Sequence, residues 1–300
     1  IQLRANYAEA WNDLGNVLAD AGRPAEAIHA FRRAIGCNGG FAKAYNNLGA
    51  VLASQGYFAQ AARAYDEAIA RDPGNLAART NLGVAQLEQG NLAPARAAFE
   101  TVIARAPSDR NALDNRLYAR LYDEADPGVI VAEHRAWGRT LPVSTPMARE
   151  RPARTLRVGY VSADFRRHSV AFFVAPVLRA HDPAVVEVFC YSDVLSPDDV
   201  TRAIQAVVPH WCDTYSWTDA ALAERIRADG IDILVDLAGH TQGNRLGLFA
   251  RRAAPIQITG IGYPATTGVP AMDYRLCDAI TDPPDAEAWS TEALLRLDPG

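Results

Sequence analysis

The sequence predicts an α plus α/β protein, in which an array of helical repeats precedes an α/β lobe with a parallel sheet. Two observations predict it. A spacing of 34 residues recurs through the first hundred positions, and buried strands alternate with helices from Leu156 onward. Such alternation indicates a parallel sheet with helices on both faces. We expect repeats over 1–107, a helical cap and linker over 108–154, and the α/β lobe over 155–300.

Composition and charge exclude several classes of protein. The 300 residues are 49% hydrophobic and 22% charged, which is typical of globular domains, and a net charge of −5 gives no case for nucleic acid. No signal peptide and no long apolar run is present, so we expect no membrane partner. The four cysteines lack metal or redox spacing. We therefore expect a cytoplasmic protein without a metal site or cofactor.

Six positions of the first half recur in register. The equivalent sets are Trp11, Tyr45 and Arg79; Leu14, Leu48 and Leu82; Gly15, Gly49 and Gly83; Gly22, Gly56 and Gly90; Ala27, Ala61 and Ala95; and Phe31, Tyr65 and Phe99. This pattern resembles the tetratricopeptide repeat, in which two antiparallel helices form each unit. We expect three units, with Ile1–Arg4 as the tail of a preceding one and with more repeats upstream.

The residue types of the repeat have physical reasons. Small residues at Gly15 and Ala27 let the two helices of a unit approach closely, and Leu14 and Phe31 fill the seam between them. Gly22 ends the first helix, where a left-handed cap residue is needed. A single unit cannot bury its apolar face alone, so neighbouring units must stack.

One polar position of the repeat is a candidate for partner binding. It holds Asp13, Asn47 and Asn81, which stacking would place in a row on one face. Amide side chains can donate to and accept from an extended peptide backbone, so the row predicts binding of an acceptor protein or peptide. A solvated face with bonds inside each repeat explains the row as well, and the sequence leaves both interpretations open.

The second half begins with a buried strand over Leu156–Ser162 and an apolar helix over Ser169–Ala180, which contains Pro176 and is open to a kink. The further predicted strands are Val186–Tyr191, His210–Thr214, Ile231–Leu237, Ile256–Ile261 and Asp273–Asp278. The predicted helices are 198–208 and Thr218–Asp229, which Gly230 ends. In the linker, His134 and Trp137 share a helix face, and we expect that face to pack on the α/β lobe.

Three loops leave the carboxyl ends of predicted strands, where open α/β sheets bind ligands. They are ADFRRH (163–168), AGHTQGNR (238–245) and GYPATTG (262–268). Their polar side chains are Asp164, His168, His240, Thr241, Arg245, Tyr263 and Thr267. Neither a GxGxxG nor a P-loop motif occurs, so spacing alone predicts a polar pocket and names no ligand.

Five segments of the second half carry a family resemblance: GYVSADFRRH, VEVFCYS, ADGIDILVDLAGHT, APIQITGIGYPATTG and MDYRLCD. Together with repeats of the style RANYAEAWNDLGN, they make nearly the whole chain resemble the O-linked N-acetylglucosamine transferases and the related SPINDLY-type proteins. The Ala-rich, Lys-poor sequence resembles a bacterial member. The resemblance implies a Rossmann-like N-terminal lobe of a GT-B glycosyltransferase behind a tetratricopeptide-repeat α-solenoid.

The resemblance also implies the reaction and the roles of residues. It implies inverting transfer of N-acetylglucosamine from UDP-N-acetylglucosamine to Ser or Thr of a protein, without a metal. His168 matches the family's essential histidine and is the candidate general base, a task that suits an imidazole. Asp164 matches an acid that orients or polarises the site. Donor-sugar contacts are implied for Ile261, Gly262, Tyr263, His240, Thr241 and Arg245.

The chain departs from the family pattern at three places. Ala265 stands where the family often has glycine. A second histidine from the linker, proposed as a base in animal members, has no clear counterpart near Tyr122 and Asp123. The chain ends at Gly300, where the first lobe finishes, and the lysine that neutralises the leaving phosphate would belong to the second lobe. We therefore expect a fragment that is inactive by itself.

Three alternatives stay open. GDP-fucose is a second candidate donor, as in SPINDLY-type proteins. The protein is alternatively a non-catalytic repeat scaffold with an α/β docking platform. His168 is alternatively a residue that caps the following helix while bonded to Asp164, or one that only positions the sugar.

Overall fold

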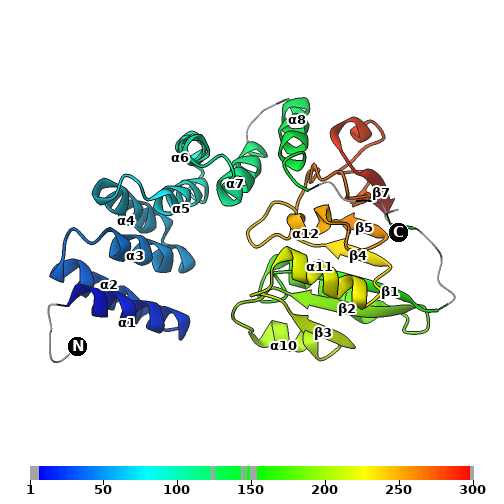
Figure 1. Cartoon of the computed structure of the whole chain (residues 1–300), viewed down its shortest axis with the longest axis horizontal. Helices are drawn as coiled ribbons and strands as arrows, with labels where there is room; N and C mark the ends of the chain where they lie inside the picture. Colours follow the sequence, from blue (N-terminus) through cyan, green and yellow to red (C-terminus); the bar gives the residue numbers. More distant parts are fainter. Residues whose placement is uncertain (1–6, 123–125, 143–144, 146, 149–153, 298–300) are drawn as a thin grey trace. The chain divides into compact units, whose positions relative to one another are not determined.

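The chain forms two compact units, residues 1–123 and 124–300, each with its own hydrophobic core (Figure 1). The computed structural model describes residues 7–122, 126–142, 145, 147–148 and 154–297. The predicted tail of a preceding repeat, Ile1–Arg4, lies outside the described residues, as does Asp123. The predicted order of a helical array and an α/β lobe is confirmed.

The first unit consists of antiparallel helix pairs followed by a single helix (Figure 1). The pairs are α1 (Ala8–Asp20) with α2 (Pro24–Cys37), α3 (Ala42–Ser54) with α4 (Phe58–Arg71), and α5 (Leu76–Leu87) with α6 (Leu92–Arg105); the single helix is α7 (Arg110–Arg120). The three predicted repeat units correspond to these three pairs.

The predicted close approach within each pair is present. A Cβ added at Gly15 would lie 2.5 Å from the ring of Phe31, and one added at Gly49 would lie 2.5 Å from the ring of Tyr65. The aromatic rings are buried, so each ring occupies the space that a side chain on the facing helix would need. The glycine is therefore part of the core packing of the repeat.

Gly22 ends α1 as predicted, with φ of +71°. The N–H of Gly22 donates to the carbonyl of Ala19 (3.0 Å) and that of Arg23 to the carbonyl of Leu18 (2.9 Å). This pair of bonds is the Schellman motif, which satisfies carbonyls at the helix end and needs a left-handed residue.

The predicted linker region is divided between the two units. Asp109 is the N-cap of α7, and its side chain accepts from the N–H of Ala112 (2.9 Å). α7 packs on α6 as the predicted cap of the array. α8 (Pro127–Gly138) belongs to the second unit.

The second unit is built on a fully parallel sheet with the strand order β3-β2-β1-β4-β5-β6-β7. Its strands are β1 (Leu156–Ser162), β2 (Val186–Ser192), β3 (His210–Asp213), β4 (Ile233–Asp236), β5 (Ile256–Thr259), β6 (Tyr274–Asp278) and β7 (Ala293–Leu297). The helices between them are α9 (Ser169–Ala180), α10 (Asp199–Gln205), α11 (Asp219–Ala228), α12 (Leu246–Ala250) and the 3₁₀ helix η1 (Ala286–Trp289).

The chain reverses its direction across the sheet between β1 and β4, which makes this the switch point where such sheets bind ligands. Three loops at this edge are named here after the strands that precede them. They are the β1 loop (163–168), the β4 loop (238–245) and the β5 loop (262–268).

α9 has the predicted bounds, and Pro176 lies inside it without ending it, because the carbonyl that loses its partner belongs to Phe172, which faces solvent. Other elements differ from the prediction. β4 and β5 end earlier than expected, at Asp236 and Thr259. α12, η1 and β7 were not predicted; β7 is a short edge strand without a strong burial pattern.

Substitution of Gly49 by alanine tests the packing inside a repeat. The new Cβ would overlap the ring of Tyr65, so we expect Gly49→Ala to lower the free energy of unfolding by about 2–3 kcal/mol. Gly36 is the matched control, because it lies in α2 and nothing is within 4 Å of an added Cβ. Gly36→Ala should raise stability by about 0.5–1 kcal/mol. Urea unfolding measures the stability of both variants. An equal change in stability for Gly49→Ala and Gly36→Ala would contradict this packing.

Candidate active site

The three loops form one continuous surface at the switch point. A Cβ added at Gly243 in the β4 loop would lie 2.7 Å from the Cβ of Ala163, which precedes Asp164 in the β1 loop. A Cβ added at Gly239 would lie 2.2 Å from the Cβ of Tyr263 in the β5 loop. The structure therefore brings the predicted polar side chains of all three loops to one edge of the sheet.

Asp164 and His168 face each other across the β1 loop. Asp164 is buried, its backbone N–H donates to the Ser162 hydroxyl (2.9 Å), and its carboxylate accepts from Arg166 (3.2 Å). His168 is the N-cap of α9, and its half-exposed ring places Nδ1 3.6 Å from the Asp164 carboxylate and 3.3 Å from the backbone nitrogen of Val170. The predicted pair is thus assembled.

Two neighbours compete for Nδ1 of His168, and they favour different tautomers. The N–H of Val170 needs a lone pair on Nδ1, which puts the proton of the neutral ring on Nε2. The Asp164 carboxylate needs Nδ1–H, which leaves a lone pair on Nε2 that can take a proton. At 3.6 Å the second contact is longer than a hydrogen bond, so the base form requires Asp164 and the ring to approach more closely.

The β5 loop follows a strained turn. Ile261 has φ of +72°, a left-handed value that β-branched residues rarely adopt, and the N–H of Gly262 donates to the carbonyl of Gly260 (2.9 Å). These features define a γ-turn of the rare positive-φ form. A Cβ at Gly262 would lie 1.9 Å from the carbonyl oxygen of Leu237, so only glycine fits. Strain of this kind clusters at functional sites, so the turn is a candidate part of the site.

Tyr263 points into a buried aromatic cluster that includes α8. Its hydroxyl lies 2.7 Å from Nε2 of His134, and Nδ1 of His134 lies 2.7 Å from the carbonyl oxygen of Ile130. The carbonyl can only accept, so Nδ1 carries the proton and Nε2 accepts from Tyr263. The ring of His240 lies edge-on to His134 (centroids 5.0 Å apart) and to Trp137 (4.4 Å).

α8 packs on the α/β lobe through His134 and Trp137, as predicted, and it also corrects an expectation. The linker does bring a histidine to the loops, but it is His134 in α8 and not a residue near Tyr122. Sequence reasoning assigned His134 only to packing, because two residues three apart on a helix also describe an ordinary buried face.

His240 and Thr241 are held by the loops themselves. His240 is buried, and its Nε2–H donates to the carbonyl of Thr267 (2.8 Å); the hydroxyl of Thr241 donates to the carbonyl of Ala238 (2.8 Å). These bonds give both residues a part in shaping the β4 and β5 loops. Their predicted contacts with a donor sugar stay predictions, as do those of Ile261, Gly262 and Tyr263.

Arg245 has a different role from the one predicted. Its guanidinium binds Asp193 with two bonds (2.6 and 2.8 Å), Asp219 (3.1 Å), and the carbonyls of Trp217 (2.9 Å) and Thr214 (3.1 Å). The bonds with Asp193 raise the pKa of Arg245. Since an arginine has five N–H donors, none is left for a sugar. We therefore reassign Arg245 from donor binding to a clamp between the β4 loop and the segments after β2 and β3.

The polar row of the repeats joins neighbouring units. The side-chain nitrogen of Asn47 donates to the side-chain oxygens of Asn12 and Asn16 in the preceding unit (3.0 Å each), and that of Asn81 donates to Asn46 (3.3 Å). Both N–H groups of Asn47 are thus used, so it would meet a peptide as an acceptor through its oxygen. The predicted peptide contacts of Asp13, Asn47 and Asn81 stay predictions.

Two buried acids that sequence reasoning missed shape the loops. Asp236, at the end of β4, accepts from the N–H groups of Ala238 (3.1 Å) and Gly239 (2.9 Å) and from the hydroxyl of Thr259 (2.7 Å); burial raises its pKa. Its signal was an acid inside the apolar run IDILVDL. Glu292 binds the β5 loop, and it had no signal because it lies in a segment without a predicted element.

In the described part of the chain, no cluster of three or more histidine, cysteine or acidic side chains is arranged to share a metal ion. No helix there combines the length and apolar character that a bilayer span requires. The absence of a metal requirement stays a prediction.

The second unit is a Rossmann-like lobe with a parallel sheet and a His–Asp pair at its switch point. The first unit is an array of helical repeats. Together they define the class of protein. The sequence model of glycosyl transferase family 41 matches residues 139–297, just over half of the chain. Tetratricopeptide repeat models match 2–45, 12–75 and 52–121. The chain therefore belongs to glycosyl transferase family 41 and carries tetratricopeptide repeats.

Relatives and a solved structure agree with this family. The chain is 41% identical over 198 residues to the probable UDP-N-acetylglucosamine–peptide N-acetylglucosaminyltransferase SPINDLY of Solanum lycopersicum, covering 63% of this chain and 21% of that protein. It is 37% identical to the SEC protein of Arabidopsis thaliana, which bears the same probable activity in its name, over 53% of this chain and 16% of that protein. An O-GlcNAc transferase mutant of Thermobaculum terrenum superimposes with a TM-score of 0.89 at 33% identity.

The chain covers only part of these proteins. It spans about a fifth of the length of the SPINDLY relatives, and the structural match covers 97% of this chain but 57% of the Thermobaculum terrenum chain.

The strained turn makes a prediction about stability. Replacing Ile261 by glycine removes a left-handed strain of about 1–3 kcal/mol and costs about 0.5–1 kcal/mol in chain entropy, so we expect a net gain of about 1 kcal/mol. Ile280→Gly is the control, because Ile280 is 82% exposed and has no positive φ, and it should lose about 0.5–1 kcal/mol. Denaturant unfolding measures the stability of both variants. If Ile261→Gly loses as much stability as Ile280→Gly, the turn at Ile261 is not strained.

The clamp makes a second prediction. Arg245→Met leaves the buried Asp193 without its cation, although the Thr214 hydroxyl still donates to it, so we expect a loss of about 3–5 kcal/mol in the free energy of unfolding. Arg167→Met breaks an ion pair whose side chains are 67% and 65% exposed and should change stability by less than about 1 kcal/mol. If Arg245→Met unfolds at the wild-type denaturant concentration, the residue is free for another role.

Proposed function

We propose that the full-length protein carrying this chain is a protein O-glycosyltransferase. It transfers N-acetylglucosamine from UDP-N-acetylglucosamine to Ser or Thr hydroxyls of proteins, with inversion at the anomeric carbon. The observation that carries the proposal is the Asp164–His168 pair at the switch point of a family 41 lobe. The printed activities of the relatives support the donor and the acceptor class.

The arrangement suits a single displacement. The acceptor oxygen attacks the anomeric carbon, the bond from that carbon to the diphosphate oxygen breaks, and UDP leaves. The hydroxyl proton passes to Nε2 of His168 when Asp164 holds the proton of Nδ1. A single attack from the face opposite the leaving group gives the inverted product.

The repeats would supply the acceptor. Stacked helical repeats form extended surfaces for partner binding, and the row at Asp13, Asn47 and Asn81 offers polar groups along the array. Because the nitrogen of Asn47 is already bonded, we propose that its oxygen accepts from a peptide N–H.

The test is nucleotide release from UDP-N-acetylglucosamine and from GDP-fucose by the full-length protein with a pool of candidate acceptors. General-base catalysis contributes about 10²–10⁴-fold, so His168→Ala should lower the rate by about that factor. His210→Ala is the control; this histidine opens β3 at the opposite edge and binds Glu187 (2.7 Å). We expect its rate to match the wild type, and no turnover from the 300-residue chain alone.

The possible outcomes distinguish the donor, the scaffold interpretation and the role of His168. UDP release that depends on His168 supports the proposal, and release from GDP-fucose alone would change the donor. If neither donor releases its nucleotide while the repeats still bind partner proteins, the protein is a non-catalytic scaffold. If the His168→Ala variant keeps its activity, the protein is still a glycosyltransferase but His168 is not its general base.

A further inference from the structure

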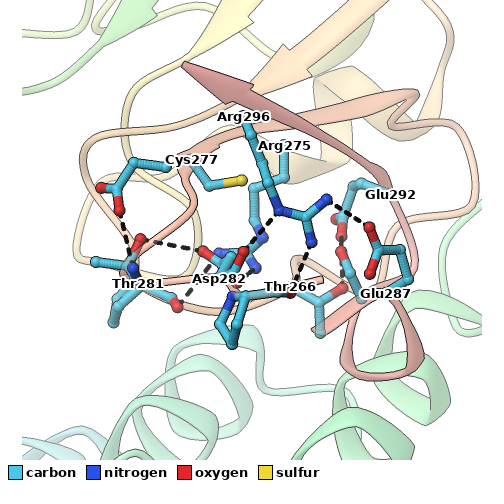
Figure 2. A network of polar contacts seen from close by, with 12 residues as sticks. Thr266, Arg275, Cys277, Thr281, Asp282, Glu287, Glu292 and Arg296 are labelled. Atoms are coloured by element: carbon cyan, nitrogen blue, oxygen red, sulfur yellow. Dashed lines mark hydrogen bonds and ion pairs between the residues drawn. The ribbon is translucent and has the colours of Figure 1, made fainter. Parts of the chain in front are cut away.

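A buried carboxylate outside the predicted site holds the β5 loop. Glu292 lies directly before β7 and is 4% exposed. Its Oε2 accepts from the hydroxyls of Thr266 (2.6 Å) and Ser290 (2.9 Å), and its Oε1 accepts from the N–H of Thr267 (2.8 Å) and from the Thr267 hydroxyl. Figure 2 shows Glu292 and Thr266 bonded in this network.

Two of the donors around Glu292, the Thr266 hydroxyl and the Thr267 backbone N–H, can only donate to it. The Thr266 hydroxyl accepts from the N–H groups of Gly268 (3.2 Å) and Thr291 (3.0 Å), so its lone pairs are used and its proton must point at Glu292. The Thr267 hydroxyl accepts from the N–H of Val269 (3.2 Å) and also donates to Glu292. The position therefore needs two oxygens that both accept, which glutamate offers and glutamine does not.

The turn held by Glu292 is in direct contact with the candidate active site. The carbonyl of Thr267 accepts from Nε2–H of His240 (2.8 Å). A Cβ added at Gly268 would lie 2.1 Å from the carbonyl oxygen of His134, so the turn and α8 meet backbone to backbone. A shift of the turn must therefore move His240, and it must also move the helix that holds His134 against Tyr263.

The other side of the loop is fixed by an ion pair. Arg275 is buried, pairs with Asp282 and lies 3.4 Å from the carbonyl oxygen of Pro264 (Figure 2). Arg296 binds the carbonyl of Asp282 (2.6 Å) and pairs with Glu287. Glu287 is part of this network but does not bond to the β5 loop, which makes it a matched control for Glu292.

We propose that Glu292 is a positioning residue for glycosyl transfer. Through Thr266 and Thr267 it holds the β5 loop in the shape that orients His240 and places Tyr263 beside the donor site. The inference rests on the proposed function for its catalytic consequence, while its structural consequence stands on the bonds of this unit alone.

The structural consequence is tested on the 300-residue chain labelled with ¹⁵N-histidine, which contains six histidines. Glu292→Gln should displace the ring nitrogen signals of His240 and His134, because the turn that accepts from His240 loses its bonds. Glu287→Gln changes the same charge at an exposed partner of Arg296 and should leave both signals in place. Imidazole spectra at equal temperature and pH compare the variants.

The catalytic consequence is tested on the full-length protein. Misplacement by about 1 Å costs on the order of 100-fold in rate, so Glu292→Gln should lower kcat about 10- to 100-fold. Glu287→Gln should keep kcat and KM within about twofold, since surface ion pairs contribute little. If Glu292→Gln does not fold, Thr267→Val removes one donor to the carboxylate, keeps the backbone bond, and should give the same displacement of the His240 signal.

Unchanged His240 signals in Glu292→Gln or in Thr267→Val would overturn the proposal. So would equal losses of kcat in the Glu292 and Glu287 variants, which would indicate general destabilisation. A wild-type protein that releases neither nucleotide removes the proposed function and the catalytic role together, and the imidazole spectra then show separately whether Glu292 orients the loop.

Discussion

Buried carboxylates that accept bonds from loop backbone and hydroxyl groups hold the carboxyl edge of this sheet in shape. Asp236 fixes the start of the β4 loop, Asp193 anchors its end through Arg245, and Glu292 fixes the β5 loop. A buried acceptor without donors is costly, so each acid strongly favours the loop conformation that satisfies it. The β4 and β5 loops are therefore held in one conformation, which is what precise placement of His240 and Tyr263 requires.

Close backbone approach is the complementary constraint. Gly262 allows the γ-turn to lie against β4, and Gly138 and Gly268 let α8 lie directly on the β5 loop. The buried carboxylates bind the loops, and the glycines, which have no side chain, allow the backbones to approach closely. In the repeats, Gly49 also allows a close approach, but there the ring of Tyr65, rather than a loop held by a carboxylate, fills the space.

Much of the fold followed from the sequence, and the misses have physical reasons. The repeats were predictable because each residue type recurs in register, and β1 and β2 because their runs are apolar. β7 was not, since its ALLRL run is short and half-exposed. Of the site, Asp164 and His168 could be placed by their position after a strand. The bonds of Arg245 could not, because they join segments that are distant in sequence.

The position of α8 has a consequence for how such proteins can be recombined. The family match begins at residue 139, yet α8 ends at Gly138 and supplies His134 to the buried cluster. A natural exchange of repeat arrays that joined a new array at the family boundary would discard this helix and leave the hydroxyl of Tyr263 without its histidine. We therefore expect viable breakpoints between array and lobe to fall upstream of Pro127, where α8 stays with the lobe that it completes.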